Sequence, residues 1–100
     1  MDATDKQTME AAVLRPYVQF PDDTIIAYGE AQEDQTVEIV IERPRDWGFD
    51  SARCIMPAYR WLDVDGFPDE DIERLESFLR DNAPLIFEFA NDPESGWRAA

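Results

Sequence analysis

The strongest constraint on the fold is a series of residues at helical spacing near the C-terminus. From position 72 to position 89, the residues of one face recur every three or four positions, with a single polar member: Ile72, Leu75, Leu79, Asn82, Ile86 and Phe89. This spacing predicts one amphipathic helix from about Asp69 to about Ala90. Pro84 is expected to kink the helix, because proline cannot donate a hydrogen bond to the carbonyl four residues earlier. The alternative is two helices that meet near Asn82.

A helix with one apolar face needs a second layer to cover that face, and the segment Thr36–Arg43 indicates a sheet. Apolar residues alternate in this segment with residues that are mostly polar: Val37, Ile39 and Ile41 against Thr36, Glu38, Val40 and Glu42. One side of this strand is therefore apolar and the other is acidic apart from Val40. The pattern predicts a sheet with one face on the core and the other in water.

Three further segments have strand composition: Val13–Phe20, Thr24–Ala31 and Arg53–Leu62. Pro16 is expected to place the first of them at a sheet edge, and Pro57 to break the last. Pro44 is expected to stop the strand Thr36–Arg43, which leaves residues 44–52 as a loop. The connections are too short for parallel crossovers, so the sheet should be antiparallel.

These elements predict one α+β domain, in which a meander-like antiparallel sheet of three or four strands packs on one face against the long C-terminal helix. The expected divisions are a flexible segment at 1–12, the domain at 13–91 and a tail at 92–100, since 100 residues suit one core. The expected core consists of Val37, Ile39, Ile41, Ile55, Ile72, Leu75, Phe78, Leu79, Ile86 and Phe89.

The net charge of −14, from 23 acidic and 9 basic residues, is the main constraint on function. It disfavours direct nucleic-acid binding and membrane association, and it favours a basic protein partner or a cation. Cys54 is the only cysteine, which fits a reducing compartment, and its apolar neighbours predict that it is buried. The N-terminal run MDATDKQT carries charges where a signal peptide needs apolar residues, so a cytoplasmic location is expected.

Carboxylates are abundant, but the other residue types and motifs that support catalysis or cofactor binding are few. The sequence contains no histidine, which removes the commonest general base and the commonest metal ligand. Asp63 and Asp65 fall on the third and fifth positions of an EF-hand loop aligned on Gly66. However, Trp61 and Ile72 then occupy the first and twelfth positions, which must supply oxygen ligands. We expect no cofactor, no metal site and no enzyme activity.

The acidic residues form two blocks along the chain. Residues 22–42 hold seven acids and no base, and residues 63–76 hold seven acids and one base. We hypothesise that the blocks converge in space as one face that docks on a basic partner. The expected members of this face are Glu30, Glu38, Glu42, Asp63, Asp65, Asp69, Glu70 and Glu73. The alternative is a charged surface that only keeps the protein soluble.

A second candidate contact surface lies between the two blocks and mixes arginine with aromatic residues: Arg43, Arg45, Trp47 and Phe49. Arginine and tryptophan are frequent hot-spot residues of protein interfaces. The alternative is that Trp47 and Phe49 cover the open end of the core while the arginines pair with nearby acids.

The leading hypothesis is a small acidic, non-catalytic protein that docks on a basic protein partner. Inhibitors, immunity proteins and antitoxin-like proteins work in this way, some of them by imitating nucleic acid. One alternative is a self-associating module in which exposed aromatics form a homodimer, and another is a small carboxylate-based enzyme. The run GFPDEDIERLESFLRDNAPLIFEF is similar in cadence to the C-terminal segments of small bacterial proteins, which favours a bacterial or phage origin.

Overall fold

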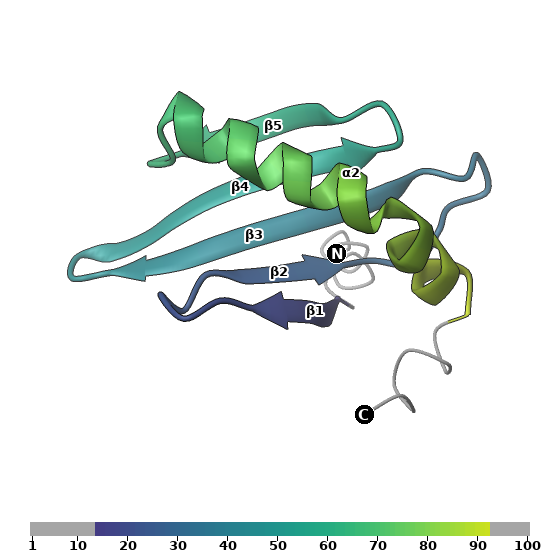
Figure 1. Cartoon of the computed structure of the whole chain (residues 1–100), viewed down its shortest axis with the longest axis horizontal. Coiled ribbons are helices and arrows are strands. Elements are labelled where there is room, and N and C mark those ends of the chain that lie inside the picture. The colour runs from purple at the N-terminus through teal and green to yellow at the C-terminus, as the bar shows by residue number, and fades with distance from the viewer. Residues whose placement is uncertain (1–13, 93–100) are drawn as a thin grey trace, which may run out of the picture.

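A computed structural model describes residues 14–92 of the chain. The expectations about a flexible segment at 1–12 and a tail beyond residue 92 lie outside the described residues. Five strands and one helix follow in chain order: β1 Arg15–Gln19, β2 Ile25–Tyr28, β3 Val37–Arg45, β4 Gly48–Met56, β5 Arg60–Asp65 and α2 Asp69–Asn91. The strands pair antiparallel in the order β1-β2-β3-β4-β5, so that each strand lies beside its neighbours in sequence (Figure 1). The predicted α+β meander is confirmed, with five strands.

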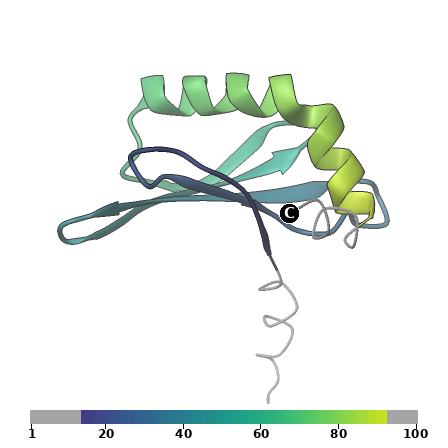
Figure 2. The ribbon, with the colours of Figure 1, turned by 60° about the horizontal axis from the view of Figure 1, so that its bottom comes forward.

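Helix α2 lies across one face of the sheet, and no other described element covers that face (Figure 2). It is a single helix from Asp69 to Asn91 with Pro84 inside it, so the prediction of one helix is confirmed. Figure 2 shows the helix bending in its C-terminal part, where the missing proline N–H weakens the backbone ladder. The bend lets the last turns follow the twisted sheet, and Ala90 at this end is buried.

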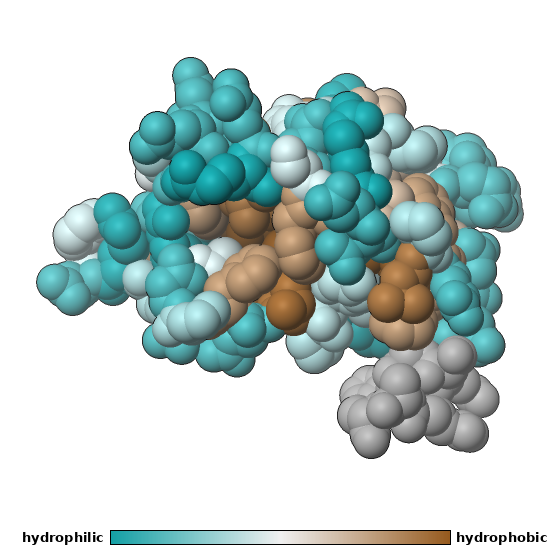
Figure 3. All heavy atoms as spheres, in the orientation of Figure 1, coloured by the Kyte–Doolittle hydropathy of each residue, from teal (hydrophilic) through white to brown (hydrophobic). Residues whose placement is uncertain are grey.

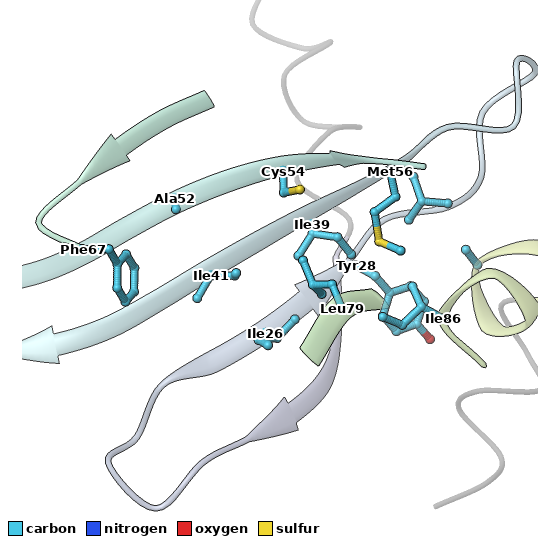
Figure 4. Close-up of a cluster of buried hydrophobic side chains, with 12 residues drawn as sticks. Ile26, Tyr28, Ile39, Ile41, Ala52, Cys54, Met56, Phe67, Leu79 and Ile86 are labelled. Carbon is cyan, nitrogen blue, oxygen red and sulfur yellow. The ribbon is translucent and has the colours of Figure 1, made fainter. Parts of the chain in front are cut away.

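The core lies between α2 and the strands β2, β3 and β4 (Figure 4). Alternate residues of the three strands point toward the helix, and their fully or nearly fully buried side chains include Ile26, Val37, Ile39, Ile41, Cys54 and Met56. The helix contributes Leu79 and Ile86, which are both fully buried. Most of the predicted core residues are buried here or pack against this cluster.

Ile55 was wrongly expected in the core. It pairs with Glu38 of β3, and this pair points to the sheet face that α2 does not cover, where Ile55 is half-buried. The flanking residues Cys54 and Met56 occupy the core side instead. Three successive apolar residues show no alternation, so the sequence could not decide which of them faced the helix.

The segment around Pro44 is a hairpin, so the prediction of a loop at 44–52 was wrong. Strand β3 continues to Arg45, a two-residue turn follows, and β4 begins at Gly48. The last pair between β2 and β3 is Ile25 with Glu42, so that Pro44 has only β4 as a neighbour. A proline without an N–H is tolerated where one side of a strand is unpaired. The predicted strand Arg53–Leu62 is broken after Met56, as expected from Pro57, and its two parts belong to β4 and β5.

Three connections meet at one end of the molecule, which we call the hairpin end: the β1–β2 turn (20–24), the β3–β4 hairpin (43–50) and the β5–α2 junction (65–71). Antiparallel pairing places them together, and Figure 1 shows them at the left of the sheet. The β2–β3 connection and the β4–β5 turn lie at the opposite end. Segments far apart in the sequence therefore share one surface.

Candidate functional site at the hairpin end

A groove of about 510 Å³ opens at the hairpin end between the β1–β2 turn and the first half of α2. Its apolar lining residues are Phe20, Pro21, Phe67, Leu75 and Phe78, and its polar lining residues are Asp22, Thr24, Arg43, Asp71 and Arg74. In Figure 3 brown side chains lie open to view between teal rims in the middle of this face. The volume falls within the range of about 300–1,000 Å³ that is usual for ligand sites.

Arg43 lines the groove and joins three elements, β3, β4 and α2. Its Nε and Nη2 donate to Asp50 Oδ2 at 3.0 and 2.8 Å, and its Nη1 donates to Asp71 Oδ2 at 3.2 Å. Its guanidinium also lies 4.6 Å from the centre of the Phe67 ring. Burial lowers the pKa of Arg43, but the bonds to Asp50 and Asp71 outweigh burial and raise it overall. The contacts connect the hairpin to the first turn of α2.

Asp50 is the buried carboxylate of this arrangement, with 3% of its surface exposed. Arg45 Nε approaches the same Oδ2 at 3.3 Å, so two arginines of β3 share one oxygen of β4. A buried carboxylate is tolerated only when it is paired in this way. The prediction that the arginines of this segment pair with nearby acids is confirmed for Arg43 and Arg45.

Two phenylalanines that line the groove come from segments far apart in the sequence. Phe20, the first residue of the β1–β2 turn, meets Phe78 of α2 edge to face at 5.2 Å between ring centres. The turn itself is closed by the Phe20 N–H donating to the Thr24 carbonyl at 2.8 Å. The Thr24 N–H donates to Asp22 Oδ1 at 3.0 Å, and hydrogen bonds from Thr24 lower the pKa of Asp22. Asp22 is thus ionised and fixed at the rim.

Beside the groove, the β3–β4 hairpin extends past the end of β2 and carries two exposed aromatics. Trp47 is 76% exposed and Phe49 is 62% exposed. The guanidinium of Arg45 lies 5.2 Å from the Trp47 ring centre, which restrains the indole. The alternative that Trp47 and Phe49 cover the end of the core is therefore wrong. This tip is the largest exposed apolar group that the structure describes.

Four of the predicted acidic residues share the sheet face that α2 leaves uncovered. Glu38 and Glu42 alternate with the buried residues of β3, and Asp65 lies in a cross-strand row with Ser51 and Glu42. Arg53 bridges Glu38 and Asp63 at 2.6 and 2.7 Å. Glu38 and Asp63 therefore share one arginine, whereas Glu42 and Asp65 have no ion pair among residues 14–92.

The other predicted acids lie elsewhere. Asp69 and Glu70 are exposed in the first turn of α2, at the hairpin end, and Glu73 follows one turn later. Glu30 is exposed in the β2–β3 connection, at the opposite end of the molecule. The eight residues do not make one continuous face. Instead, the hairpin end brings together members of both acidic blocks, with Glu42 from the first and Asp65, Asp69 and Glu70 from the second.

Sequence reasoning missed the groove, although a local signal was present. The sequence contains two Phe–Pro pairs that follow strands, Phe20–Pro21 after β1 and Phe67–Pro68 after β5. Both phenylalanines line the groove. A phenylalanine fixed beside a turn proline is well placed to line a surface depression. What the sequence could not show is that the two turns are neighbours, because that follows from the strand order.

Three other functional possibilities concern a reactive cysteine, a metal site and a membrane-spanning helix. Cys54 is fully buried, as predicted, and burial raises the pKa of its thiol to about 12. Within residues 14–92, histidine, cysteine, aspartate and glutamate form no cluster suited to holding a metal ion. The one helix that the structure describes is not apolar enough over its length to cross a membrane.

Comparison with protein-family models, curated proteins and solved structures found no match for this chain.

Proposed function

We propose that this protein is a non-catalytic binding protein that docks on a basic protein surface through its hairpin end. The observation that carries the proposal is the tip of the β3–β4 hairpin, where Trp47 and Phe49 are 76% and 62% exposed beside carboxylates that have no ion pair among the described residues. An indole in water on a projecting hairpin has an unfavourable contact with solvent that a partner would relieve.

Exposed aromatic and charged residues have different roles in protein interfaces, and the hairpin end carries both kinds. Buried tryptophan anchors supply most of the binding energy, and charged residues at the rim govern encounter and specificity. Here the anchor is Trp47, and the rim includes Asp46 in the turn, Glu42 and Asp65 on the sheet, and Asp69 on the helix. The preference for binding over catalysis rests on the sequence, which contains no histidine.

The test is affinity capture from extracts of the source cells, quantified by mass spectrometry, with two pairs of matched variants. Trp47→Ala is compared with Leu85→Ala, which removes an exposed side chain near the other end of α2. We expect one basic protein to be retained by the wild type and by Leu85→Ala and lost with Trp47→Ala. A partner that Trp47→Ala and the wild type retain equally would overturn the proposal.

The charge pair of variants tests the rim. Glu42→Gln/Asp65→Asn changes the hairpin end, and Glu30→Gln/Glu33→Gln changes the opposite end by the same charge. We expect only the first to weaken capture, and capture by the wild type to weaken as NaCl is raised, because salt screens attraction between opposite charges. Equal weakening by both variants would mean that net charge, and not this surface, determines binding.

Self-association through Trp47 and Phe49 is the second candidate, favoured by the same exposed aromatics. Salt separates the two, because a chain of charge −14 repels its own copies. A homodimer would therefore become tighter as NaCl is raised, while a complex with a basic partner would become weaker. Sedimentation velocity across a range of protein and salt concentrations measures this directly.

A further inference from the structure

We infer that the groove binds a pair of adjacent side chains of the basic partner, one apolar or aromatic side chain on the phenylalanine floor and one lysine or arginine against Asp22. This inference rests on the proposed function and names the part of the partner that the hairpin end recognises. The occupant is identified by complementarity of shape and charge with the lining residues.

The floor selects an apolar group. Phe20, Leu75 and Phe78 are half-buried, and Phe67 is buried beneath Arg43. Their uncovered surface faces the groove, where water contacts it in the free protein. A flat aromatic or a branched aliphatic side chain gains the most from entering such a depression, and aromatic contacts add an edge-to-face or stacked geometry.

The pairing of the charged lining residues leaves one carboxylate for a cation beside that apolar group. Arg43 is paired with both Asp50 and Asp71. Arg74 is also paired with Asp71, so the two arginines of the lining are matched by these two carboxylates. Asp22 remains as the one lining carboxylate without an ion pair among residues 14–92. The formal charges of the lining balance, and Asp22 is the lining carboxylate that is open to a cation from a partner.

Asp22 is also held in place for this role. Thr24 is 4% exposed and donates its N–H to the carboxylate, which fixes the orientation of Asp22 before any ligand arrives. An anionic ligand would be repelled by the fixed negative charge of Asp22 at the rim. A second copy of the chain would bring an overall charge of −14 against it. A basic and apolar segment avoids both penalties.

The experiment uses small probes in place of the partner and follows backbone amide signals of the whole protein by NMR. Tryptamine supplies an aromatic group with an ammonium, indole-3-propionate supplies an aromatic group with a carboxylate, and ethylamine supplies the ammonium alone. We expect tryptamine to shift the signals of Thr24, Asp71 and Leu75 saturably, and the other two probes to shift them much less. Equal or stronger shifts with indole-3-propionate or ethylamine would overturn the inference.

Asp22→Asn, with Asp23→Asn as its matched control, tests the assigned carboxylate. Asp23 is the next residue in the same turn but does not line the groove. We expect Asp22→Asn to weaken tryptamine binding about two- to fivefold, the size of one exposed ion pair, and Asp23→Asn to leave it nearly unchanged. Equal affinities for Asp22→Asn and the wild type would remove Asp22 from the site.

Two further outcomes separate this inference from the proposed function. Absence of saturable tryptamine shifts, together with capture that depends on Trp47, would overturn the groove assignment and leave the proposed function standing. Saturable tryptamine binding, together with capture that does not depend on Trp47, would support the groove assignment and overturn the proposed role of the hairpin tip. Groove signals that move with protein concentration and no probe would identify a second copy as the occupant and overturn the inference.

Discussion

Replacing Arg43 by methionine tests the physical account of the hairpin end most directly. The change removes the contacts to Asp50 at 3.0 and 2.8 Å and leaves that carboxylate, 3% exposed, with Arg45 alone at 3.3 Å. Removing one partner of a buried pair typically costs about 3–5 kcal/mol. Because Arg45 stays in place, we expect a loss of about 2–3 kcal/mol in the free energy of unfolding for Arg43→Met.

Urea unfolding at neutral pH measures this loss, and thermal unfolding checks it. For a domain of this size each kcal/mol lowers Tm by about 4–8 °C, so a decrease of about 10–20 °C is expected. Arg60→Met is the matched control, since Arg60 is exposed on β5 and its loss should change stability by less than about 0.5 kcal/mol.

A double-mutant cycle with Asp50→Asn gives the decisive result. If the pair is coupled, the double variant is less destabilised than the sum of the single variants, because no charge is left buried without its partner. Two results would refute the idea that this ion pair holds the hairpin end together. One is a loss of unfolding free energy for Arg43→Met no larger than that for Arg60→Met. The other is a double variant whose loss equals the sum of the losses of the two single variants.

Three other predictions concern single sites. Gly66→Ala should lower stability by about 1–3 kcal/mol in urea unfolding, because Gly66 has φ of +100° and a Cβ there would overlap the Asp50 carboxylate. Cys54 should react with a thiol reagent at pH 8 only after unfolding by urea, since burial raises its pKa to about 12. Hydrogen bonds from Trp61 and then Arg80 lower the pKa of Glu76, so its contribution to stability is complete above the ordinary value of 4.5 and is lost as pH falls through the lowered value. Glu76→Gln should therefore flatten the acid side of the stability–pH profile, and an unchanged slope would contradict the assignment.

The elements that could be predicted from the sequence are those with a clear period. Strand β3 alternates over Val37, Ile39 and Ile41, and all three are fully buried. The apolar residues of α2 keep the same helical spacing before and after Pro84. The segment is a single helix in which Leu79 and Ile86 are fully buried. In both cases the burial of one face against the other layer reinforces the local pattern.

The hairpin end could not be predicted, because its local signals pointed away from the observed structure. Pro44 indicated the end of a strand, yet it lies where only one neighbour pairs with β3. Residues 44–52 were expected to form a loop, yet Asp50 of this segment is buried in β4, paired with Arg43 and Arg45 of the adjacent strand. Both outcomes depend on strand pairing and side-chain contacts that no periodicity within one segment reveals.

The distribution of charge links the fold to the proposed recognition. Arg43, Arg45, Arg53, Arg74 and Arg80 each contact a carboxylate. The first three connect neighbouring strands or join the hairpin to α2, and the last two pair within α2. Glu42, Asp65 and Asp69 have no ion pair among residues 14–92, and they lie, like the exposed Trp47, at the hairpin end. Positive charge thus stabilises the domain while uncompensated negative charge collects beside its largest exposed aromatic. If this separation serves recognition, moving the same acids to the opposite end should preserve solubility and net charge but abolish the salt-sensitive capture of a basic partner.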